Sequence, residues 1–121
     1  GMAIKYSPFD ADSVAFCAAD NFGIVGKGKL FILKTLPDGR IEVRNMVEEN
    51  DAIFDCSWSE TNDNLVLTAG GDGSIKLWDI VSRNLVVNLK DHNKEVYSVE
   101  CSHKHPNTFL SSGVDGFVKL W

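Results

Sequence analysis

An internal repeat constrains the fold of this chain more than any other feature of its sequence. Residues 53–78 align without a gap on residues 96–121, so the two copies lie 43 residues apart, and both end in Lys-Leu-Trp. A weaker copy precedes them, because residues 4–8 correspond to residues 56–60 and about seven extra residues follow at 21–27. A period of about 20 to 50 residues indicates units that bury one another by stacking.

Within each copy, short runs of β-forming residues alternate with turn residues. In the second copy, the run 65–68 is followed by Gly-Asp-Gly and then by the run 75–78. An Asp-Gly pair between two such runs is typical of a β-hairpin. Further runs follow at 41–47 and 85–89, and no long window has the apolar spacing of a helix. We therefore expect an all-β chain with eleven strands and no helix.

The string Gly-Asp-Gly-Ser-Ile-Lys-Leu-Trp-Asp at 71–79, within a 43-residue period, resembles the WD-repeat family. The resemblance implies a β-propeller with one four-stranded blade per repeat of about 40 to 45 residues. The chain would supply about three of an expected seven blades. We expect a divergent first blade over 2–47 with its insertion at 21–27, a second blade over 48–89 and an incomplete third blade over 90–121, and we interpret Gly1 as a tag remnant.

In the WD-repeat family, a His, a Ser or Thr, an Asp and a Trp form a buried hydrogen-bonded tetrad that braces a blade. The third copy matches this pattern with His92, Ser111, Asp115 and Trp121. The second copy keeps Thr68, Asp72 and Trp78. It has Glu49 in the place of His, and the first copy keeps only Asp20. Although Ser, His and Asp are also the residue types of a hydrolase triad, we interpret these residues as structural and expect no catalytic residues.

Several classes of partner and cofactor are disfavoured by the composition. The formal net charge is −5, and the sequence contains no cluster of basic residues that would face phosphate groups. Both observations argue against nucleic acid as a partner. No apolar run approaches the roughly 20 residues of a membrane-spanning helix, so membrane insertion is not expected. The three cysteines lie far apart without zinc-site spacing, and they are interpreted as buried thiols of a reducing compartment. We expect no metal and no cofactor.

An acidic and aromatic pattern recurs at one end of the repeats. Glu49 and Asp51 precede Phe54 in the second copy, and Glu95 precedes Tyr97 in the third. Aromatic anchors beside charge are typical of peptide-binding hot spots. These residues, together with Val114, form our candidate peptide-binding set. The alternative is that the acidic run is a solvated loop and that both aromatic residues serve packing.

The segments 6–9, 17–33, 54–60, 71–79 and 95–99 together resemble receptors for the type 2 peroxisomal targeting signal, the peroxin-seven family. The resemblance implies a non-catalytic receptor that binds a basic amphipathic signal helix of cargo proteins. It also implies an import co-receptor and a cytoplasmic protein that cycles to the peroxisome or a related organelle. A generic WD-repeat adaptor in another complex is the alternative, and an enzyme is a third hypothesis that no convergent set of titratable groups supports.

The chain would present only two blades and most of a third, whereas propellers close with about four to eight. The end blades would then expose apolar faces and an unpaired strand edge. We therefore expect a polypeptide of these 121 residues to self-associate.

Overall fold

The computed structural model describes residues 3–19, 27–90, 92–105 and 108–121, and these residues form eleven strands and no helix, as predicted. The strands are β1 (Ala3–Tyr6), β2 (Ser13–Ala19), β3 (Gly28–Thr35), β4 (Ile41–Glu49), β5 (Ile53–Trp58), β6 (Leu65–Gly70), β7 (Ser74–Asp79), β8 (Asn84–Lys90), β9 (Val96–Cys101), β10 (Phe109–Gly113) and β11 (Val118–Leu120). Gly1, Asp20 and most of the expected insertion at 21–27 lie outside the described residues.

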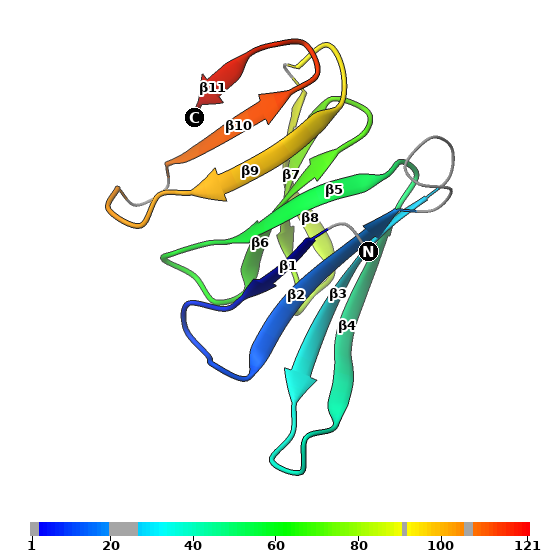
Figure 1. The fold of residues 1–121 in the computed structure, drawn as a ribbon, viewed down its shortest axis with the longest axis vertical. Coiled ribbons are helices and arrows are strands. Elements are labelled where there is room, and N and C mark those ends of the chain that lie inside the picture. Colours follow the sequence, from blue (N-terminus) through cyan, green and yellow to red (C-terminus); the bar gives the residue numbers. More distant parts are fainter. Residues whose placement is uncertain (1–2, 20–26, 91, 106–107) are drawn as a thin grey trace.

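The strands form three antiparallel sheets in chain order (Figure 1). Blade 1 contains β1 to β4, blade 2 contains β5 to β8, and blade 3 contains β9 to β11. Each sheet is a meander in which every strand pairs with the next one along the chain. Blade 2 lies between the other two, because β5 contacts both β2 and β9. This arrangement confirms the prediction of a partial β-propeller.

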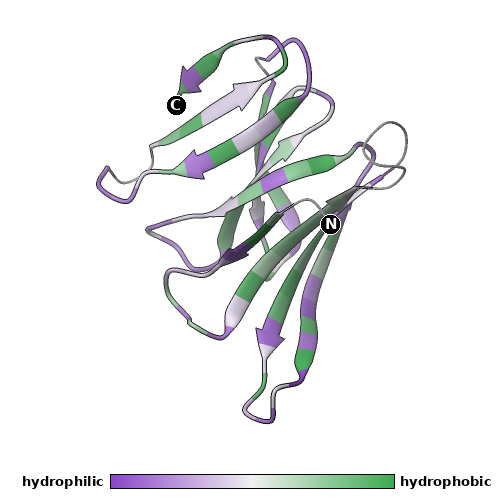
Figure 2. Cartoon of the chain, in the orientation of Figure 1, coloured by the Kyte–Doolittle hydropathy of each residue, from purple (hydrophilic) through white to green (hydrophobic). Residues whose placement is uncertain are grey.

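The core lies between the blades rather than within any one of them. Ala15, Leu30 and Ile32 of blade 1 pack against Trp58 and Val66 of blade 2, and all five are buried. Figure 2 shows the apolar residues concentrated on the strands and the hydrophilic residues at the turns. β5 is buried along almost its whole length because it has a blade on each side. A strand in that position needs apolar residues on both faces, which explains the imperfect alternation.

Hydrogen bonds fix the blades against one another. Trp58 Nε1 donates to the Lys5 carbonyl at 3.0 Å and joins blade 2 to blade 1. The Asp55 carboxylate of blade 2 accepts from the Val99 amide of blade 3 at 3.1 Å. The Ser57 hydroxyl oxygen also accepts from the Cys101 amide at 3.1 Å. Because these bonds involve backbone atoms of the inner strands, they set the relative height of successive blades and of the loops that the strands carry.

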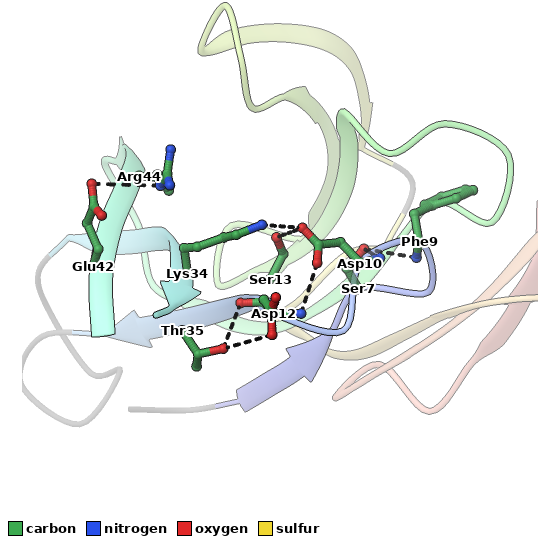
Figure 3. A network of polar contacts seen from close by, with 9 residues as sticks. All are labelled: Ser7, Phe9, Asp10, Asp12, Ser13, Lys34, Thr35, Glu42 and Arg44. Atoms are coloured by element: carbon green, nitrogen blue, oxygen red, sulfur yellow. Dashed lines mark hydrogen bonds and ion pairs between the residues drawn. The ribbon is translucent and has the colours of Figure 1, made fainter. Parts of the chain in front are cut away.

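A polar network closes the loop between β1 and β2 (Figure 3). The Asp10 carboxylate accepts hydrogen bonds from the Asp12 amide at 2.9 Å, from the Ser13 hydroxyl at 2.9 Å and from Lys34 Nζ at 2.6 Å. The Lys34 contact is the main reason why the pKa of Asp10 falls to about 2. The network therefore ties this loop to β3 through an ionised carboxylate.

Asp10 is expected to titrate near pH 2 rather than near its ordinary value of 3.8. Because the folded pKa lies below the unfolded one, the stabilisation is present above pH 3.8 and is lost as the pH falls through about 2. Carbon NMR of the Asp10 carboxyl measures this titration. In Lys34→Met the midpoint should rise towards 3.8, and a native midpoint already at 3.8 would contradict the assignment.

Candidate functional site

The four tetrad residues of blade 3 form one chain of hydrogen bonds. His92 Nδ1 lies 2.9 Å from the Asp115 carboxylate, and His92 Nε2 lies 2.8 Å from the Ser111 hydroxyl. Trp121 Nε1 donates to the same Ser111 oxygen at 2.9 Å. A neutral imidazole that carries its proton on Nδ1 satisfies every group, since Ser111 then donates to Nε2. These hydrogen bonds join the loop before β9 to β10, to the β10–β11 turn and to the residue after β11.

The Ser111 hydroxyl is buried within the tetrad. Ser111 is only 2% exposed, and its oxygen already accepts the Trp121 N–H. Burial acts to raise the pKa of Asp115, but hydrogen bonds from the Phe117 amide, His92 and the Asn93 amide outweigh it, so this pKa lies below its usual value. The carboxylate stays ionised and holds the imidazole in place. The four side chains thereby link the loop before β9 to β10 and to the end of β11.

In blade 2, an ion pair takes the place of the contact between His92 and Asp115 in blade 3. Trp78 Nε1 donates to the Thr68 hydroxyl at 3.0 Å, as the corresponding pair does in blade 3. The Glu49 carboxylate, however, binds Lys76 Nζ, which also lies 3.7 Å from the Asp72 carboxylate. Lys76 was missed by the sequence reasoning. The sequence feature that could have indicated Lys76 is the carboxylate of Glu49 in the place of His, because a partly buried carboxylate requires a cation nearby. Lys76 pairs across the sheet with Thr68, which belongs to the same tetrad pattern.

The two candidate aromatic residues meet at the seam between blades 2 and 3. Phe54 and Tyr97 occupy equivalent positions on the inner strands β5 and β9, and their rings make an edge-to-face contact with centroids 4.8 Å apart. Phe54 is 8% exposed, whereas Tyr97 is 52% exposed. Phe54 therefore serves mainly as a packed base, and Tyr97 is the aromatic surface that a partner could contact.

Asp51 lies beside this aromatic pair. A Cβ atom on Gly71 would come within 2.8 Å of the Asp51 carboxylate and 3.5 Å of the Phe54 ring, so these three residues are immediate neighbours. Asp51 Oδ1 accepts from the Ala52 amide at 2.8 Å, which orients the carboxylate. The absence of a side chain at Gly71 thus gives the carboxylate its place next to the ring.

Glu95 and Val114 form the blade 3 part of the same edge. The Val114 amide donates to the Glu95 carbonyl at 3.0 Å, and the Val114 side chain is 45% exposed. Among the described residues, no cation forms an ion pair with Asp51 or Glu95, in contrast to Glu49. We call residues 51–54, 71, 95–97 and 114 the entry rim. Its available charge is negative, and its exposed surface is aromatic and aliphatic.

Other chemistry has little support in the described part of the chain. No three His, Cys, Asp or Glu side chains gather there in a way that could hold a metal ion. His103 lies 2.7 Å from the Glu60 carboxylate and contributes to a loop at the opposite end of the strands. No helix long and apolar enough to cross a membrane occurs within these residues.

The repeats match a family model described as "WD domain, G-beta repeat" over residues 42–79 and 83–121. These matches cover more than half of the chain, and each contains the last strand of one sheet and the first three strands of the next, β4–β7 and β8–β11. The chain belongs to the WD-repeat family.

Within the WD-repeat family, the chain is similar to several proteins named as receptors for peroxisomal targeting signal 2. The chain is 39% identical over 87 residues to the peroxisomal targeting signal 2 receptor of Komagataella phaffii, an alignment covering 72% of this chain and 23% of the relative. It is 46% identical over 79 residues to the Saccharomyces cerevisiae receptor of that name, covering 65% and 21% respectively. The Homo sapiens receptor is 38% identical over 79 residues, covering 65% and 24%. The chain thus spans about a quarter of the length of these relatives.

Proposed function

We propose that this chain is part of a non-catalytic receptor that recognises the type 2 targeting signal of cargo proteins for import into the peroxisomal matrix. The observation that carries the proposal is the likeness to several proteins named as receptors for this signal. In this proposal the receptor works in the cytoplasm with an import co-receptor and cycles to the peroxisome or a related organelle.

The entry rim supports a basic peptide as the ligand. Tyr97 offers an exposed ring on which an apolar or cationic side chain could pack. Asp51 and Glu95 place two carboxylates without ion-pair partners on the same edge. Negative charge on the receptor would steer a basic amphipathic helix to the rim and orient it there. Glu49 contributes least, because its charge is neutralised by Lys76.

The blade 3 tetrad supports the proposal that the protein is not an enzyme. Its Ser, His and Asp have the mutual distances of a catalytic triad, yet the hydroxyl is enclosed and bonded to Trp121. Geometry of this kind stabilises a blade rather than a transition state. A generic WD-repeat adaptor remains the second candidate, because the fold alone serves many complexes.

Charge reversal at the rim tests the proposal in the full-length protein. Asp51→Lys and Glu95→Lys should each weaken binding of a fluorescent type 2 signal peptide roughly tenfold at low salt, and less at high salt. Fluorescence anisotropy over a salt series measures the dissociation constants.

Asp63→Lys is the matched control, because Asp63 is exposed on the loop between β5 and β6 at the opposite end of the strands. This variant changes the net charge by the same amount and should bind normally. Equal weakening by all three variants would indicate only a general effect of net charge. Failure of the unmodified protein to bind the peptide would favour the adaptor alternative.

A further inference from the structure

An apolar groove separates blades 2 and 3 at the end of the strands opposite the entry rim. Its walls are formed by Leu65, Leu67 and Leu77 of blade 2 and by Cys101 and Phe109 of blade 3, and it encloses about 140 Å³. We call it the inter-blade groove. No side chain of the described chain fills this space.

The internal repeat shows what fills the equivalent space one blade earlier. At the shift of 43 residues, Cys101 stands where blade 2 has Trp58. The Trp58 indole is 4% exposed, lies between blades 1 and 2, and donates to the Lys5 carbonyl. Packing between the first two blades is thus completed by an indole. Between the second and third blades, a small thiol occupies that position.

Larger neighbours do not compensate for the missing indole. The strand register places Leu67 of blade 2 at the position that Ala15 has in blade 1. The repeat places Phe109 of blade 3 at the position that Val66 has in blade 2. Phe109 instead stacks on Trp121, with ring centroids 5.9 Å apart, and leaves the groove open. An apolar cavity of about 150 Å³ is large enough for a benzene ring, whereas small-molecule sites usually exceed about 300 Å³. The groove therefore has the size of a single aromatic side chain.

The charges at the groove indicate what would lie beside that side chain. Glu60 is the one charged residue among the described lining residues, and its carboxylate lies 2.7 Å from His103 Nδ1. Glu100, 3.9 Å from His103 Nε2, does not line the groove, because it pairs with Leu110 in the exposed row of blade 3. The Glu60 carboxylate at the groove favours a cationic neighbour on the ligand.

We propose that the inter-blade groove receives one aromatic side chain from a peptide segment of a partner protein, with Lys or Arg next to it in sequence. The ring occupies the place that Trp58 fills in the preceding interface. The cation lies near Glu60. This second site goes beyond the signal-binding rim, because it lies at the other end of the strands and shares no residue with it.

Methyl NMR of the full-length protein tests the proposal with two probe peptides, acetyl-Trp-Lys-amide and acetyl-Ser-Lys-amide. The tryptophan peptide should shift the methyl signals of Leu65, Leu67 and Leu77, whereas the serine peptide should not. Cys101→Trp places an indole in the groove and should weaken binding of the tryptophan peptide at least tenfold. Cys101→Ala keeps the groove open and should bind normally.

Leu77→Phe provides a second way to fill the groove if the tryptophan variant does not fold. Binding of the signal peptide at the entry rim should be unchanged in all three variants, which separates this proposal from the receptor function. Equal shifts with both peptides, no shift with either, or full binding by the filled variants would overturn it.

Discussion

Replacement of Gly73 with alanine is expected to lower the free energy of unfolding by about 2 to 5 kcal/mol. Gly73 has a φ of 86°, in the left-handed region where a side chain costs about 1 to 2 kcal/mol. A Cβ atom would also come within 2.5 Å of the His92 carbonyl oxygen and 3.0 Å of the Lys94 carbonyl oxygen. Both atoms belong to the backbone, so relief requires blade 3 to shift away from the β6–β7 turn, which adds about 1 to 3 kcal/mol.

Gly116 is the matched control, because it occupies the equivalent turn of blade 3. Its φ is 83°, but nothing lies within 4 Å of its hypothetical Cβ atom. In a polypeptide of residues 1–121, Gly116→Ala should therefore show only the conformational cost of about 1 to 2 kcal/mol. Urea denaturation at one protein concentration compares the two variants. Equal destabilisation would mean that the close packing of blade 3 on the β6–β7 turn contributes nothing to stability.

The two glycines also illustrate how far the sequence alone could predict this fold. The repeat and its Asp-Gly turns predict the strand order and the three sheets, because hairpin chemistry is local. Gly73 and Gly116 are identical in that local pattern. The difference between them is set by the loop before β9, which packs against only one of the two turns. That loop belongs to the repeat that follows Gly73, and no repeat that follows Gly116 lies within residues 1–121, so the difference reflects the range of the sequence rather than the turns themselves.

The candidate site shows the same limit. The acidic and aromatic pattern places Phe54 and Tyr97 at equivalent positions, but it does not distinguish the buried ring from the exposed one. Glu49 and Asp51 are equivalent as charges in the sequence. In the structure, Lys76, 27 residues away from Glu49, neutralises one carboxylate and leaves the other available. The inter-blade groove was not predicted either, because its signal is a difference between two aligned copies rather than a motif.

A polypeptide of residues 1–121 alone is expected to form a dimer or a larger assembly. Ile4, Phe16, Phe31 and Met46 form one cross-strand row in blade 1, and Ile4 and Met46 are 64% and 38% exposed. At the other end, paired Leu110 and Leu120 of blade 3 are 49% and 71% exposed, and Val118 is 72% exposed. β11 also pairs on one side only, which leaves an edge available for another strand.

These two ends resemble the faces that already bury one another between successive blades, so burying them would be favourable by about 25 cal/mol per Å² of apolar surface. Copies should join end to end or face to face and bury the exposed rows. Light scattering on a dilute sample should give at least twice the monomer mass of 13.4 kDa. Leu120→Lys should favour the monomer, whereas Val86→Lys, on the outer strand β8, should not. A well-folded 13.4 kDa species that persists as the concentration rises would show that the end faces are stable in water.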